Sequence, residues 1–178
     1  MNKLLGHFLT ITKHRHLVMV ACFKAGIPWR GLVHDLSKYS PTEFIPGVRY
    51  YTGTHSPTAD ERLQIGYSTA WMHHKGRNRH HFEYWTDFSP TLKKNIPVPM
   101  PLQFLVEMFC DRLAACKVYQ KSDYTDKSAL DYYLSRKSTE DMHPQTAQIL
   151  EHLLRMLAEK GEKETFRYIR TTLLNHRH

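Results

Sequence analysis

The 178-residue chain lacks the long apolar runs, paired cysteines and repeats that mark several common protein classes. No apolar stretch approaches the ~20 residues that a membrane-spanning helix needs. The short apolar start is soon interrupted by histidines, Lys13 and Arg15, which argues against a signal peptide. The three cysteines are an odd number without a CxxC spacing, a pattern typical of reduced thiols. We therefore expect a cytoplasmic protein with no membrane segment.

The composition is that of a folded protein with a basic surface. Apolar residues make up 41% of the chain and charged residues 24%, and the length favours one domain over residues 1–178. The net charge of +8 favours anionic partners such as nucleotides, phosphorylated metabolites or nucleic acid. The basic residues are scattered over many segments, so nucleic acid is not the favoured partner. The sequence leaves a homodimer open.

Apolar residues recur at intervals of three and four along most of the chain, which predicts an all-α fold. No segment has a convincing strand pattern, and the prolines at 97, 99 and 101 predict a loop from Ser89 to Pro101. Ser40-Pro41-Thr42-Glu43 fits a capping box at the start of a helix. The expected helices cover about 4–24, 28–35, 41–51, 57–75, 102–120, 126–136, 144–161 and 162–175.

Potential metal ligands lie at three separated points of the chain. His34 and Asp35 are adjacent, and Lys38 follows them. His14 falls on the apolar stripe of the first helix, and Asp111 falls within the stripe of a strong helix. Inward polar groups cost several kcal/mol unless they are paired or metal-bound. Imidazoles and carboxylates that project inward from several helices are a typical divalent-metal site.

Each of these residues also has a structural interpretation. Asp111 fits an ion pair with a neighbour such as Arg112, and His14 fits a hydrogen-bonded core histidine. His34-Asp35 fits a helix end, and Lys38 fits a lysine that complements a helix dipole. These interpretations must all hold at once to exclude a metal, so the metal hypothesis is favoured.

Two further histidine pairs stand at 73–74 and 80–81. His74 is the better inward candidate of its pair, because it shares a predicted face with Leu63, Tyr67 and Ala70, although His73 also remains a candidate. Only one of His80 and His81 can point inward if their segment is regular. We therefore expect at least one of these four histidines to coordinate metal.

The order His14, His34-Asp35, Asp111 resembles the signature of the HD-domain superfamily of metal-dependent phosphohydrolases. His34-Asp35-Leu36-Ser37-Lys38 is similar to the His-Asp-x-Gly-Lys form common there, with Ser37 where glycine is usual. The resemblance covers roughly residues 10–120 and implies a compact HD-like helical bundle. Additional C-terminal helices would then occupy about 126–175. The histidine pattern His-His-Lys-x-x-Asn-x-His-His narrows the resemblance to a small bacterial family, which names no substrate.

The resemblance implies one or two divalent ions (Fe, Mn, Zn, Mg or Co) and hydrolysis of a small phosphorylated compound such as a nucleotide. The predicted metal ligands are His14, His34, Asp35, His74, His80 and Asp111. Asp35 and Lys38 are the predicted catalytic residues, and Lys38, Arg77 and Arg79 are predicted to bind substrate phosphate. A binuclear-iron oxygenase and a non-catalytic nucleotide- or nucleic-acid-binding protein are the alternatives.

Overall fold

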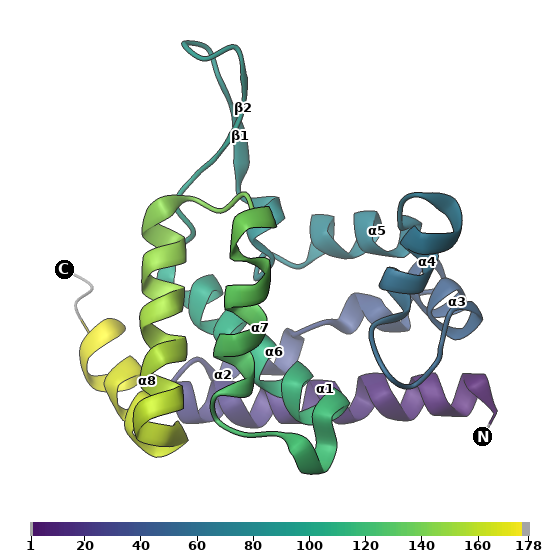
Figure 1. The fold of residues 1–178 in the computed structure, drawn as a ribbon, viewed down its shortest axis with the longest axis horizontal. Coiled ribbons are helices and arrows are strands. Elements are labelled where there is room, and N and C mark those ends of the chain that lie inside the picture. The colour runs from purple at the N-terminus through teal and green to yellow at the C-terminus, as the bar shows by residue number, and fades with distance from the viewer. Residues whose placement is uncertain (1, 176–178) are drawn as a thin grey trace.

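The computed structural model describes residues 2–175, and most of them lie in helices (Figure 1). This confirms the all-α class. The α-helices are α1 Lys3–Ala25, α2 Pro28–Val33, α3 Pro41–Arg49, α4 Pro57–Ile65, α5 Thr69–Arg77, α6 Leu102–Gln120, α7 Ser128–Arg136 and α8 Pro144–Tyr168. Short 3-10 turns include η1 Leu36–Tyr39 and η2 Phe82–Tyr84, and a π-helical segment, η5 Ile169–Leu173, follows α8.

The first helix has clear start and stop signals. The side chain of Asn2 accepts a hydrogen bond from Leu4 N, which caps the N-terminus of α1. Gly26 ends α1 in the left-handed conformation, and Pro28 opens α2 at its first position. The chain therefore reverses within two residues, and α2 packs back against α1.

The core is built around α6, which packs against both α1 and α8. Its residues from Phe104 to Cys110 are all buried. Val18 and Cys22 of α1 meet it from one side, and Leu153 of α8 belongs to the same apolar cluster. Figure 1 shows α3, α4 and α5 grouped towards the N-terminal end of α1 and α7 beside α8 at the other end. His14 is one of the buried residues of α1 and lies near the middle of that helix.

Residues 86–97 form a β-hairpin, which corrects the prediction that the chain has no strand. Strand β1 Thr86–Ser89 pairs antiparallel with β2 Lys94–Pro97, and the hairpin projects from the helical body (Figure 1). Its turn places Lys93 in the left-handed region, at φ 52°. Glycine or asparagine usually occupies such a position, and neither residue marks this turn in the sequence. The predicted loop from Ser89 is therefore partly a strand.

The helix predicted from Pro57 through His74 is two helices, because Gly66 ends α4 in the left-handed conformation. The shared face that we predicted does not exist. Leu63 is 83% exposed and Tyr67 is 56% exposed, whereas Ala70 and His74 are buried on α5. The burial of His74 was predicted correctly for a wrong reason.

Four further features can be compared with the sequence predictions: the burial of α1, the break at Gly161, membrane-spanning helices and the cysteines. His14 is buried between Ile11 and Val18, as its predicted place on the apolar stripe of the first helix requires, whereas Leu4 and Phe8 near the start of α1 are exposed. The break predicted at Gly161 is present as a non-helical residue inside α8. Within residues 2–175, no helix has both the length and the apolar character that a membrane crossing requires. The three cysteines are buried and free.

Candidate metal centre

Asp35 lies at the centre of the site, in the turn between α2 and η1. Its backbone is left-handed, with φ 53° and ψ 27°, and its exposed fraction is 1%. A non-glycine residue in this region costs of order 1 kcal/mol, and such strain is often found where a side chain must be aimed. Here it directs the two carboxylate oxygens towards two different sets of histidines.

The first set combines α1, the α2–η1 turn and α6. His14 Nε2 lies 2.8 Å from Asp111 Oδ1, and His34 Nε2 lies 3.6 Å from the same oxygen. Asp35 Oδ2 lies 3.3 Å from His34 Nε2 and 3.9 Å from His14 Nε2. These four residues are the HD-type ligands predicted from the sequence, and we call them the first metal group.

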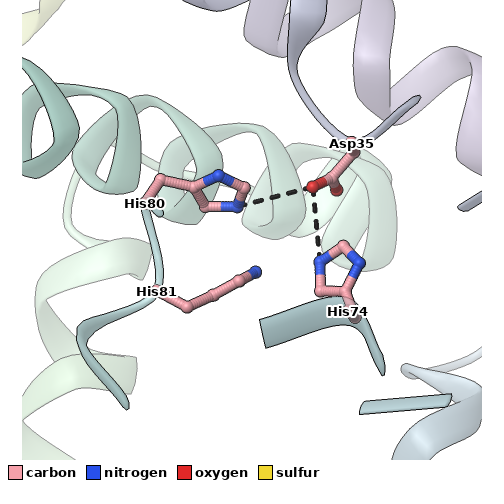
Figure 2. Close-up of side chains that lie close together, drawn as sticks. All are labelled: Asp35, His74, His80 and His81. Atoms are coloured by element: carbon pink, nitrogen blue, oxygen red, sulfur yellow. Dashed lines mark ion pairs between the residues drawn. The ribbon is translucent and has the colours of Figure 1, made fainter. Parts of the chain in front are cut away.

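The second set faces the other oxygen of Asp35. His74 Nε2 on α5 lies 3.3 Å from Asp35 Oδ1, and His80 Nε2 lies 3.5 Å from it. Figure 2 shows the rings of His74, His80 and His81 arranged around one space into which Asp35 points. We call these four residues the second metal group. Asp35 belongs to both groups, through one oxygen in each.

Each group has dimensions that suit a single ion. The potential ligand atoms of a group all lie within 4.8 Å of one another. Two ligands on opposite sides of a zinc-sized ion are separated by about 4 Å, twice a metal–nitrogen bond. A small contraction would therefore bring each set into bonding range. The mixed imidazole and carboxylate donors suit Fe, Mn, Zn or Co better than Mg, which prefers oxygen ligands.

The hydrogen bonding of these atoms also fits a metal. The Nε2 atoms of His14, His34 and His80 and both oxygens of Asp35 are buried, and within residues 2–175 none makes a hydrogen bond of acceptable geometry. Several lie close to a charged neighbour, as Oδ2 of Asp35 does to Lys38 Nζ at 2.7 Å, but none of these contacts meets the geometry of a hydrogen bond. A buried polar atom left without a partner costs about 1–3 kcal/mol. A bound cation would give these five atoms a common partner.

The carboxylate of Glu107 lies next to the Nδ1 atoms of His34 and His80, on the side of each ring that faces away from Asp35. Glu107 Oε1 on α6 lies 3.0 Å from His34 Nδ1 and 3.2 Å from His80 Nδ1. Arg30 donates from Nε to Glu107 Oε2 at 2.6 Å. Burial opposes ionisation of Glu107, but the two imidazoles outweigh it and lower its pKa to about 2. Glu107 therefore stays charged at neutral pH.

Glu43 on α3 supports the second metal group from the opposite side. Its Oε2 lies 2.7 Å from His74 Nδ1, and its Oε1 lies 2.6 Å from His73 Nδ1. The predicted capping box is therefore wrong in part. Pro41 does open α3, but Ser40 makes no side-chain capping bond, and the Glu43 carboxylate accepts hydrogen bonds from the two histidines. His73 lies outside the metal groups and shares a support carboxylate with His74.

Lys38 lies inside the site. Its Nζ is 2.7 Å from Asp35 Oδ2, and its side chain is 30% exposed, so it lies between the buried ligands and solvent. Burial alone would lower the pKa of Lys38, but the charges of Asp35 and Asp111 raise it above the ordinary value. Burial would raise the pKa of Asp35, but the charges of His34 and Lys38 hold it well below its usual range. The pair is ionised at neutral pH.

Of the other residues considered in the sequence analysis, His81 lies in the site, whereas three arginines lie outside the two metal groups. His81 was one of two alternatives, but both it and His80 contribute to the second metal group because their segment is an irregular turn. Arg77 and Arg79 are exposed, and the Arg79 guanidinium lies 5.6 Å from the Tyr84 ring centroid, so their substrate role stays a prediction. Arg112, the suggested partner of Asp111, instead pairs with Glu140 at 2.9 Å.

The sequence did not identify Glu43, Glu107 or Arg30 as site residues. A signal for Glu107 exists, because it stands four residues before Asp111 and so shares its helix face. His34, His80 and Glu107 also form a third group with metal-like spacing. Its carboxylate is already paired with Arg30, so an ion there would approach a guanidinium. We interpret this third group as support for the other two.

A model for a family of unknown function, DUF5662, matches residues 3–156. No curated protein and no solved structure matches the chain. None of these comparisons links the chain to the HD-domain superfamily, so that resemblance stays a prediction from the motifs. The match covers most of the chain, and the chain therefore belongs to DUF5662.

Proposed function

We propose that this protein is an HD-type metal-dependent phosphohydrolase that holds two divalent ions and acts on a small phosphorylated compound, such as a nucleotide. The single observation that carries the proposal is Asp35. It is a buried carboxylate whose two oxygens face two different imidazole sets and make no hydrogen bond of acceptable geometry. A shared carboxylate of this kind is what a pair of adjacent metal ions requires.

Divalent ions held in the two metal groups would act as Lewis acids and lower the pKa of water towards ~7, which supplies hydroxide at neutral pH. The residues of the chain have distinct parts in this chemistry. Asp35 fixes the separation of the two groups, because it belongs to both. Lys38 offers an ammonium at the partly exposed side of the site, where it can stabilise charge on a phosphoryl oxygen.

Access for the substrate is supported by the exposure of particular atoms. The side chains of His34, Asp35 and His80 are 0–1% exposed, whereas those of Asp111 and Lys38 are 18% and 30% exposed. A phosphate is therefore expected to enter beside Asp111 and Lys38. The net charge of +8 favours the approach of such an anion.

Phosphate release provides the test. Protein loaded with Mn²⁺, Co²⁺ or Fe²⁺ is incubated with nucleoside mono-, di- and triphosphates and with sugar phosphates. We expect release with at least one compound, and we expect Asp35→Asn to abolish it while Glu151→Asn, on the far helix α8, leaves it unchanged. If metal-loaded protein releases no phosphate from any of these compounds, hydrolysis is contradicted.

A binuclear-iron oxygenase is the second candidate. The observation that favours it is the second metal group, in which three of the four ligands are imidazoles, a donor set that suits iron. Oxygen consumption by Fe²⁺-loaded protein, in the presence of a phosphorylated or hydroxylated organic compound, separates the two chemistries. Hydrolysis proceeds without oxygen, whereas an oxygenase consumes it.

A further inference from the structure

Glu107 touches both metal groups at once. Its Oε1 lies 3.0 Å from Nδ1 of His34, which belongs to the first group, and 3.2 Å from Nδ1 of His80, which belongs to the second. The carboxylate is fully buried, and the His34 and His80 rings are tilted neighbours with centroids 4.4 Å apart. One carboxylate oxygen therefore lies behind one potential ligand of each metal group.

Arg30 fixes the other oxygen of Glu107. The guanidinium donates from Nε to Oε2 at 2.6 Å, and it also lies 4.4 Å from the centroid of the Phe104 ring. Two rigid elements, α2 and α6, thus hold the carboxylate in place. Glu107 cannot turn its second oxygen towards the histidines without breaking this ion pair.

An imidazole whose Nδ1–H faces a carboxylate must present the lone pair of Nε2 on its opposite side. Metal-bound histidines generally have such a partner, which fixes the tautomer and the ring orientation. His34 Nδ1 forms this hydrogen bond with Glu107, whereas His80 Nδ1 lies 3.2 Å from the same oxygen as an ion-pair contact without hydrogen-bond geometry. The Nε2 sides of both rings face Asp35 and the two metal groups. We infer that Glu107, held by Arg30, is a positioning residue shared by both ions, so that its loss weakens binding at both groups together.

This inference rests on the proposed function, because it needs two bound metals. Glu43 provides the contrast that makes it testable. That carboxylate holds His74, a ligand of the second group alone, and His73, which belongs to neither group. Loss of Glu43 should therefore weaken only one ion, whereas loss of Glu107 should weaken two.

The experiment is a calorimetric titration of the chelator-treated full chain with Mn²⁺. Wild type, Glu107→Gln and Glu43→Gln are compared with Glu61→Gln as the matched control. Glu61 is also a buried carboxylate, 2% exposed, but it accepts its hydrogen bonds from Ser68 and Thr69. The event that His81→Ala removes is assigned to the second group.

We expect Glu107→Gln to lower the affinity of both binding events by about 10- to 100-fold. Glu43→Gln should lower only the second, and Glu61→Gln should lower the melting temperature without changing either. If Glu107→Gln leaves one event unchanged, or if Glu43→Gln weakens both equally, the shared role is refuted. If wild type binds no Mn²⁺, Co²⁺ or Fe²⁺, the proposed function fails and this inference fails with it.

A second variant covers the case in which Glu107→Gln does not fold. Arg30→Met frees Oε2 of Glu107 but leaves the contacts of Oε1 with the histidines. We expect it to weaken both events by a smaller factor than loss of the carboxylate. Unchanged affinities at both groups would contradict the role assigned to the Arg30–Glu107 pair.

Discussion

Replacement of Lys38 by alanine separates metal binding from substrate binding. Lys38 Nζ lies 2.7 Å from Asp35 Oδ2, and among the described residues Lys38 is not a member of either metal group. Ions held in the two metal groups would supply positive charge beside Asp35 when the ammonium is removed. We therefore expect Lys38→Ala to keep two metals and to lose affinity for phosphate.

The size of the loss follows from the position of the ammonium. A hydrogen bond to a charged group contributes about 1.5–3 kcal/mol. The Lys38 side chain is 30% exposed and its charge is shared with Asp35, so the lower end of this range applies. A loss of about 1.4 kcal/mol corresponds to a tenfold weaker affinity.

Titration of metal-loaded protein with inorganic phosphate measures this effect, and elemental analysis of the same samples checks the metal content. Lys127→Ala is the control, because that lysine is 67% exposed and pairs with Asp131 on the helical surface. Equal phosphate affinity in Lys38→Ala and wild type, at full metal occupancy, would refute the role of Lys38. Loss of metal from Lys38→Ala would show that the lysine supports the ligands themselves.

Three further predictions concern the ligands and a neighbouring histidine. Asp35→Ala should remove both ions, because each group contains this carboxylate, and an elemental analysis that still finds one equivalent would contradict a shared ligand. His81→Ala should reduce the content from two ions to one, and retention of two would exclude His81 from the second group. Burial, aided by the charge of Lys38, lowers the pKa of His7 from 6.5 to about 4. The unfolded chain therefore takes up a proton that the folded chain does not, and stability falls as the pH drops through this range, by about 3 kcal/mol. His7→Gln should flatten that part of the pH profile of urea unfolding, and a profile as steep as wild type would exclude His7 as its source.

Much of the first metal group could be predicted from the sequence because its residues follow regular rules. His14 and Asp111 lie on apolar helical stripes, where an unpaired polar side chain needs a partner. The His34-Asp35 pair stands at a predicted helix end, and the structure brings all four residues together. What the sequence could not give is the left-handed backbone of Asp35, which aims its oxygens apart.

The second metal group was harder to predict because irregular structure positions it. His80 and His81 both face inward only because the segment after α5 is a turn, and a periodic pattern cannot describe a turn. The position of Glu43, three residues after Ser40, was misleading. It fits a capping box, but the carboxylate in fact accepts hydrogen bonds from His73 and His74. The hairpin escaped detection because Lys93 occupies the position that glycine usually marks.

The support residues depend on tertiary contacts that no local pattern contains. Glu107 meets His34 and His80 across separations of 73 and 27 residues in sequence, and Arg30 reaches it from α2. A buried glutamate on an apolar helix was visible in the sequence, but its partners were not. Long-range contacts of this kind determine which histidine nitrogen faces the site.

The most direct test of the binuclear metal centre is the metal content of wild-type protein expressed in metal-replete medium and purified without chelator. A binuclear centre predicts two equivalents of a transition metal per chain, falling to none in Asp35→Ala. A content below about a tenth of an equivalent, in protein that is folded by circular dichroism, would contradict the existence of the metal centre.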